Sequence, residues 1–239
     1  MYTAKRKIIM AIFCTALLVA FGAGFAGRSS AAVGDVIKLG GFDWRVLEVK
    51  DGNALIISDK ILSKGAYNIP DKGVLYDSLG SVWQDTPVKW EECTLRQYLN
   101  GQFYDSTFSN EEKGRIVETT IVNNDNPWFG MAGGNDTTDK VFLLSLEEVV
   151  LYFGDSGELG NRPKDADTIN DSFNEKRIAE TLDGNACRWL LRSPGLFHRM
   201  CDSNHVYAGC VAVNGYLSVI GEYVHNEYSG IRPAMWIKQ

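Results

Sequence analysis

The C-terminal run from Cys187 to Ile237 constrains the fold more than any other segment of the chain. Its centre is the pair Asn214-Gly215, which separates two runs of alternating apolar and polar residues. This arrangement is a strong signal for a two-strand hairpin, because both residues accept the positive φ angles of a tight turn. Apolar strand patterns that carry Trp and Arg precede and follow the hairpin. The run therefore predicts an antiparallel sheet at the C-terminal end.

The N-terminal end of the domain predicts strands as well. Residues 36–39, 42–49 and 54–57 are rich in apolar side chains, and Asp51-Gly52 between the last two is a hairpin signal. Residues 63–89 contain several Gly and Pro residues and predict a long irregular connection. We expect the N- and C-terminal strands to share one antiparallel sheet.

The middle of the chain predicts short helices. Ser109 and Ser145 each stand three residues before a glutamate, which is the capping-box signature of a helix start. Residues 94–100 place apolar side chains on one helical face, and Gly101 after them is typical of a helix end. Helices are expected at residues 94–100, from residue 109, at 145–153 and at 174–182, with strands at 116–122 and 141–144. This order of elements predicts an α+β fold with long loops.

The start of the chain has the pattern of a secretory signal peptide. Basic residues 5–7 precede an uncharged apolar stretch, and the small residues Ser30-Ala31-Ala32 close it. We expect residues 1–32 to be removed and residues 33–239 to form a single α+β domain. The alternative is an uncleaved anchor, because residues 8–27 are long enough to span a bilayer. Both alternatives place the domain outside the cytoplasm, either secreted or on the cell surface.

The net charge of the chain excludes some classes of binding partner. The formal net charge is −6, and the predicted leader contains basic residues but no acidic ones, so the domain itself is more acidic. Nucleic acids and anionic membrane surfaces bind clustered Lys and Arg. We therefore expect no nucleic-acid partner, and membrane contact only through residues 8–27 if these stay attached.

Several longer motifs carry a resemblance to a known family. They are Leu95-Arg96-Gln97-Tyr98-Leu99-Asn100, Asp139-Lys140-Val141-Phe142-Leu143-Leu144-Ser145, Trp189-Leu190-Leu191-Arg192-Ser193-Pro194-Gly195 and Gly230-Ile231-Arg232-Pro233-Ala234-Met235-Trp236-Ile237. With them the chain resembles, over Val33 to Ile237, an uncharacterised domain family abundant in exported proteins of Gram-positive gut bacteria. That family has no assigned activity, so the resemblance implies no reaction.

The closing Gly-Ile-Arg-Pro strand is also similar to the end of C-type-lectin-like folds of the formylglycine-generating-enzyme type. This similarity implies a C-type-lectin-like fold. In that enzyme class a pair of active-site cysteines performs the oxidation. Cys201 and Cys210 lie outside the matching context, so the resemblance does not carry that activity to this chain.

No complete catalytic constellation is present in the sequence. There is no paired His at metal-ligand spacing, no phosphate loop and no dinucleotide fingerprint. The segment Gly154-Asp155-Ser156-Gly157 looks like the nucleophile segment of trypsin-like proteases, in which the His base precedes the Ser. All three histidines of this chain follow that segment. We therefore expect no catalytic residues.

Asn135, Asp136 and Asp139 are the best candidates for a metal site. They offer hard oxygen ligands on a loop that contains glycines, which suits Ca²⁺. The same residue types also stabilise turns through short side-chain hydrogen bonds, and we favour that role. No other cofactor is expected.

The domain keeps an even number of cysteines, which permits two disulfides in an exported protein. They are Cys93, Cys187, Cys201 and Cys210. Cys201 and Cys210 are the pair closest in sequence and would close a loop before the hairpin. The alternative is that these residues are small buried side chains with free thiols.

The Trp and Arg residues of the C-terminal strands are expected to be structural. They are Trp189, Arg192, Arg232 and Trp236, with Asn214 and Gly215 setting the register of the hairpin. A buried Arg needs a partner, so we expect an arginine–acid lock across the C-terminal sheet. The candidate acids are Glu222, Glu227 and Asp202, with a backbone carbonyl as the alternative.

Ligand binding is expected in the loops at residues 123–139 and 196–207. The candidate residues are Trp128, Asn135, Asp136, His198, Asn204 and Tyr216. Aromatic side chains that could stack on sugar rings are Trp83, Trp128, Tyr216, Tyr223 and Tyr228. The leading hypothesis is an exported, non-enzymatic binding or adhesion module for a glycan or protein ligand. The alternatives are a secreted enzyme acting on cell-wall or dietary polymers and a structural domain of a surface assembly.

Overall fold

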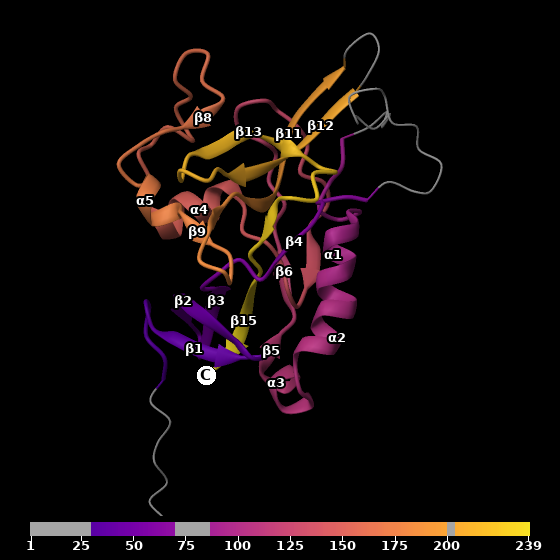
Figure 1. The fold of residues 1–239 in the computed structure, drawn as a ribbon, viewed down its shortest axis with the longest axis vertical. Helices are drawn as coiled ribbons and strands as arrows, with labels where there is room; N and C mark the ends of the chain where they lie inside the picture. The colour runs from indigo at the N-terminus through magenta and orange to yellow at the C-terminus, as the bar shows by residue number, and fades with distance from the viewer. Residues whose placement is uncertain (1–29, 70–86, 200–203) are drawn as a thin grey trace, which may run out of the picture.

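The computed structural model describes residues 30–69, 87–199 and 204–239, and nearly all of the predicted leader lies outside them. Two β-sheets, one above the other in Figure 1, organise the chain, with helices on both flanks. The first sheet has the order β1-β2-β3-β15-β5 and is antiparallel throughout. Its strands are β1 (Val36–Leu39), β2 (Phe42–Lys50), β3 (Asn53–Ser58), β5 (Ile116–Val117) and β15 (Ala234–Lys238).

The predicted N-terminal strands are confirmed, and so is the turn between β2 and β3. Asp51 and Gly52 both have positive φ angles, of 50° and 76°, which matches the twist that a two-residue hairpin turn requires. The chain ends do share a sheet, because β15 pairs with β3 over Ala234 to Lys238.

The second sheet has the order β4-β14-β11-β12-β13-β8. Its strands are β4 (Ser63–Lys64), β8 (Thr168–Ile169), β11 (Trp189–Arg199), β12 (Asn204–Val211), β13 (Leu217–Tyr223) and β14 (Gly230–Ile231). All its pairings are antiparallel except β11 with β14. The N- and C-terminal strands, which were expected to form one sheet, are therefore divided between two sheets. The chain crosses from one to the other at Arg232-Pro233, between β14 and β15, where proline has no N–H to continue a ladder.

The hairpin at Asn214-Gly215 is confirmed. Strands β12 and β13 pair antiparallel up to Val211 and Leu217, and the turn lies between these two residues. Gly215 has a φ of 82°, and a Cβ atom there would lie 2.0 Å from the carbonyl oxygen of Asn174. Only glycine fits this position, so the turn also fixes how the hairpin meets the segment at Asn174.

Both capping boxes are present. Ser109 caps α3 (Asn110–Arg115), and Ser145 caps α4 (Leu146–Phe153). In each box the glutamate three residues later accepts a hydrogen bond from the backbone N–H of the serine. The first helix is longer than predicted, because α1 (Thr94–Tyr98) continues through a π-helical turn at Leu99–Phe103 into α2 (Tyr104–Thr107). Gly101 therefore does not end it.

The predicted helix at residues 174–182 is also corrected. Only α5 (Asn174–Arg177) is helical, and β9 (Ala179–Glu180) then pairs with β10 (Ala186–Cys187). The expected strand at 116–122 is divided between β5 and β6 (Thr119–Ile121), and β6 pairs with β7 (Thr137–Asp139). Residues 141–144 are buried but form one isolated bridge, from Phe142 to Ala234, in place of a strand.

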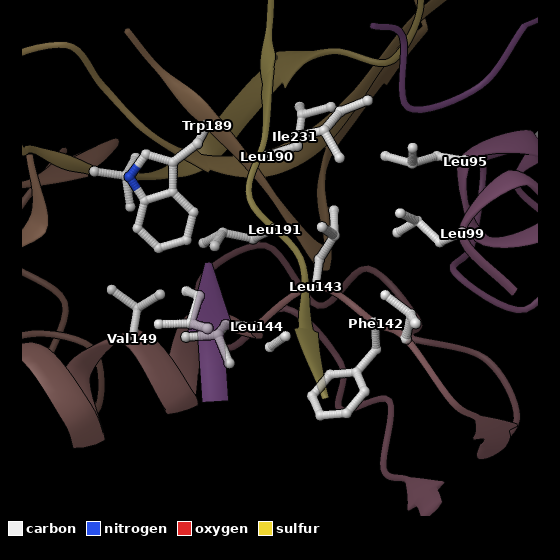
Figure 2. Close-up of a cluster of buried hydrophobic side chains, with 14 of the residues drawn as sticks. Leu95, Leu99, Phe142, Leu143, Leu144, Val149, Trp189, Leu190, Leu191 and Ile231 are labelled. Atoms are coloured by element: carbon white, nitrogen blue, oxygen red, sulfur yellow. The ribbon is translucent and has the colours of Figure 1, made fainter. Parts of the chain in front are cut away.

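One hydrophobic core joins the two sheets. Leu143 and Leu144 lie between α1 and α4, and side chains of both helices and of the C-terminal strands converge on them (Figure 2). The labelled side chains are Leu95, Leu99, Phe142, Leu143, Leu144, Val149, Trp189, Leu190, Leu191 and Ile231. Burial of so many large apolar side chains is the main stabilising contribution to the fold. Within the three described ranges, no helix has the length and apolar character that a membrane crossing requires.

Candidate functional site

Arg192 on β11 forms a buried lock with helix α4. Its guanidinium makes two hydrogen bonds to the Glu148 carboxylate, the one from Nη2 being 3.0 Å long, and Nη1 also donates to the Leu143 carbonyl at 2.8 Å. Glu148 is the same glutamate that closes the capping box of α4. The arginine–acid lock is present, but its acid comes from α4. The expected acid Glu222 forms an ion pair with Arg188 instead.

Trp189 and Arg232 lie together in the core, while Trp236 does not join them. The Trp189 side chain is fully buried, and the guanidinium carbon of Arg232 stands 5.0 Å from the centre of its ring. Trp236 is half-buried on β15. Asn214 supports the hairpin turn, where its Oδ1 accepts a hydrogen bond from the Tyr216 N–H. The Trp189 side chain is therefore part of the core, and the Arg232 guanidinium packs against it.

Asp139 is a structural carboxylate. It is completely buried, and its oxygens accept hydrogen bonds from Trp90 Nε1, Thr137 Oγ1 and Arg96 Nε at 2.7 to 2.8 Å. These donors stabilise its charge as a metal ion would. Across the described part of the chain, no group of three or more His, Cys, Asp or Glu side chains could hold a metal ion.

The neighbouring candidates Asn135 and Asp136 are exposed, and both contact residues of earlier segments. Asn135 donates both its backbone N–H and its side-chain amide to the carboxylate of Glu91, which lowers the pKa of that carboxylate. An oxygen of Asp136 lies 3.4 Å from the backbone nitrogen of Asn123. Glu91 and Asn123 lie 44 and 13 residues before Asn135 and Asp136, so these contacts join segments that are separate in the sequence.

The described cysteines are free thiols. Cys93, Cys187 and Cys210 are all buried without a disulfide, and Cys201 lies outside the described residues. Burial raises the pKa of Cys93 to about 12 and that of Cys210 to about 11. The thiols of Cys93 and Cys210 are therefore protonated at neutral pH and behave as small apolar side chains.

The predicted ligand-binding residues do not gather at one place. Trp128 donates its indole N–H to the Leu159 carbonyl, and Arg162 stacks over its ring. Tyr216 lies at the hairpin turn, at the opposite end of β12 and β13 from His198 and Asn204, which end β11 and begin β12. Trp83 lies outside the described residues. The segment 196–207, expected to be a loop, is strand up to Arg199 and again from Asn204.

Ring side chains gather on the second sheet near the end of β11 and the start of β12, at the end of the β12–β13 pair that lies away from the Asn214-Gly215 turn. We call this group the ring face; it consists of His198, His205, Tyr207, Tyr223 and His225. The Tyr207 and Tyr223 rings are 4.6 Å apart between centres, and His205 and His225 stand 5.5 and 5.6 Å from Tyr223. His198 is exposed and lies directly opposite His205 on the neighbouring strand. This face contains all three histidines of the chain.

The strand register explains why these rings meet. Directly opposed residues of antiparallel strands share a face, and so do residues two apart on one strand. Tyr207 opposes Tyr223, His198 opposes His205, and the residues that alternate with them, Val206 and Val224, are buried in the core. The spacing of His205 and Tyr207 two residues apart can be read from the sequence, but their pairing with residues of β11 and β13 cannot.

The strands approach closely beneath Tyr207. Gly195 on β11 has its backbone against that residue, and a Cβ atom at position 195 would lie 2.7 Å from the Tyr207 Cβ and 2.4 Å from the Ile220 carbonyl oxygen. Burial and a hydrogen bond to Tyr223 raise the pKa of Tyr207 well above its ordinary value. The Tyr207 phenol is thus uncharged at neutral pH. The ring face presents half-buried aromatic surfaces, bordered by polar ring edges, to solvent.

Comparison with known proteins places the chain in one family. A family model described as a domain of unknown function, DUF6273, matches residues 51–239, and the chain belongs to this family. The match confirms the expected uncharacterised domain family, although it begins at residue 51 and not at 33. It includes the whole ring face and the Arg192 lock. Neither the search of curated proteins nor that of solved structures returned a match.

Proposed function

We propose that this member of the DUF6273 family is an exported, non-enzymatic module that binds a glycan through the ring face. The observation that carries the proposal is the cluster of Tyr207, Tyr223, His205 and His225, with ring centres 4.6 to 6.4 Å apart on one side of the β12–β13 hairpin. Stacked, partly exposed rings offer flat apolar surfaces, and C–H groups of sugar rings pack on such surfaces. The imidazole and phenol edges add hydrogen-bonding groups for sugar hydroxyls.

The location of the rings favours ligand binding over a purely structural role. Their apolar neighbours Val206 and Val224 already fill the core beneath them. Holding rings half-exposed leaves apolar area in contact with water, and a ligand that covers this area gains the corresponding free energy. A protein ligand is the second possibility for the same face, because Tyr residues are enriched in protein interfaces.

The proposal also includes a specific type of fold. We infer a C-type-lectin-like arrangement, supported by the pairing of N- and C-terminal strands in one sheet and by the long connections between elements. Export rests on the pattern of residues 1–32. Calcium at Asn135, Asp136 and Asp139 is not part of the proposal, because the oxygens of Asp139 already accept three hydrogen bonds.

A glycan array tests this function, followed by calorimetry with any sugar that binds. We expect Tyr223→Ala to weaken binding about tenfold, which corresponds to ~1.4 kcal/mol. Tyr216→Ala is the matched control, since it removes the same ring from the same hairpin at its other end. We expect the control to bind like the wild type. A blank array with and without Ca²⁺, or equal losses in both variants, would overturn the assignment.

A further inference from the structure

A cavity of about 620 Å³ lies between the first sheet and the segment that contains α5 and β9. Strand β2 supplies one wall, the end of α4 and residues 175–180 supply the other, and Arg232 lies among the lining residues. In Figure 1 these elements are on the side away from α1 and α2. The volume is in the range of pockets that hold small molecules. The cavity is separate from the ring face, and no residue of that face lines it.

Arg232 is unusual among the three buried arginines of the described residues. Arg177 makes two hydrogen bonds to the Asp171 carboxylate and Arg192 makes two to Glu148. Arg232 is only 4% exposed, yet the described residues give it no carboxylate at ion-pair distance. Its charge is buried without the counter-charge that buried ions normally have.

The contacts of Arg232 leave one donor group unused. Nε donates to the Ser58 carbonyl at 3.0 Å, and Nη2 lies 3.5 Å from the Asp59 carbonyl oxygen. The guanidinium lies near the rings of Trp189 and Phe153. Nη1 has no hydrogen-bond partner in the described structure. Burial lowers the pKa of Arg232 to about 10, consistent with a charge that lacks a close anion.

The acidic residues of the cavity wall are largely occupied. Asp59 forms an ion pair with Arg45 at 2.6 Å, and Glu180 forms one with Lys60 at 3.6 Å. Arg232 therefore has to share the nearest carboxylate, Asp59, with a second arginine. An anion that entered the cavity would supply the missing counter-charge. Because Nε and Nη2 already face backbone carbonyls, Nη1 is the donor left for a carboxylate, and a hydrogen bond between these two charged groups is stronger than one between neutral groups.

We propose that this cavity binds a small molecule through a carboxylate group held by Arg232. The apolar part of such a ligand would pack on Phe153 and Ile178, which line the same cavity. Two sources offer this chemistry, the uronic acid of an acidic glycan and the carboxylate of a short peptide. The site is a second one, independent of glycan binding at the ring face.

Calorimetry on the purified protein tests the proposal with glucuronate and glycylglycine as probes, and with glucose and glycylglycinamide as matched controls that lack the carboxylate. We expect saturable binding of a carboxylate probe at least tenfold tighter than that of its control. The probe that binds more tightly identifies the source of the carboxylate. Absence of saturable binding by both probes, or equal binding of glucose and glucuronate, would overturn the site.

A wall variant locates the site without removing Arg232. Ile178→Trp narrows the cavity, and we expect it to weaken carboxylate binding at least tenfold. Leu182→Trp is the matched control, because Leu182 is exposed on the following segment and does not line the cavity. Tyr223→Ala should bind the carboxylate normally, which separates this site from the ring face. Full binding by Ile178→Trp, or equal loss in both tryptophan variants, would contradict the proposed location.

Discussion

Arg192 and Arg232 occupy similar positions in the sequence but different surroundings in the fold. Arg192 lies on β11 and Arg232 lies between β14 and β15, each is near a tryptophan in the sequence, and each is 4% exposed. Arg192 is bonded to the carboxylate of Glu148 and to the Leu143 carbonyl, so its charge is balanced within the protein. Arg232 has backbone carbonyls and aromatic rings around it, and a cavity beside it. Two buried arginines can thus have different roles. Arg192 connects two elements of the fold through an ion pair, and Arg232 keeps a charge that is available to a ligand.

The largest effect that follows from this comparison is expected at the Arg192 lock. Arg192→Met leaves the Glu148 carboxylate without its buried partner, and such a loss costs about 3–5 kcal/mol of unfolding free energy. Urea denaturation measures it. The double variant Arg192→Met with Glu148→Met removes both charges and should recover part of the loss. A single variant within ~0.5 kcal/mol of the wild type would show that the lock does not stabilise the fold.

A smaller effect is expected at Arg232. Arg232→Met removes a buried charge that has no carboxylate partner and replaces it with an apolar chain of similar length. The loss of two carbonyl hydrogen bonds and of the ring contacts is offset by the removal of the desolvated charge, so we expect a change within about 1 kcal/mol. The same urea experiment measures it. A cost as large as that of Arg192→Met would mean that Arg232 is a structural lock too.

The smallest effect concerns two buried thiols, those of Cys93 and Cys210. The raised pKa values of Cys93 and Cys210, about 12 and about 11, keep both thiols protonated at pH 8. Because the thiolate is the reactive form, iodoacetamide at pH 8 should not label them in the folded protein. Unfolding in urea should expose them to rapid labelling, which peptide mass spectrometry detects. Labelling of the folded protein, or a disulfide at Cys93 or Cys210, would contradict these values.

Much of the local structure could be predicted from the sequence because it rests on residues close together in the chain. Asn214-Gly215, Asp51-Gly52 and the capping boxes at Ser109 and Ser145 each act within four residues, and all four appear as predicted. The first helix was predicted too short. Asn100, at its centre, is bonded to the Val141 carbonyl and to the backbone N–H of Lys140, contacts that lie far away in sequence.

The site could be predicted only in part, for the same reason. Tyr223 was recognised as a candidate for stacking, but its neighbours Tyr207 and His205 depend on a strand register that no local pattern reveals. The partner of Arg192 comes from a helix 44 residues earlier. The cavity beside Arg232 depends on six separate segments that meet only in the folded chain.

The most direct test of the difference between the two arginines is to follow both during one titration. In protein labelled with ¹⁵N-arginine, the side-chain Nε–H signals of Arg192 and Arg232 report on their bonding, and each is assigned by its Met variant. With glucuronate or glycylglycine as the probe, we predict that the Arg232 signal shifts to saturation while the Arg192 signal stays in place. An unmoved Arg232 signal with both probes, or equal shifts of the two arginines, would contradict the account.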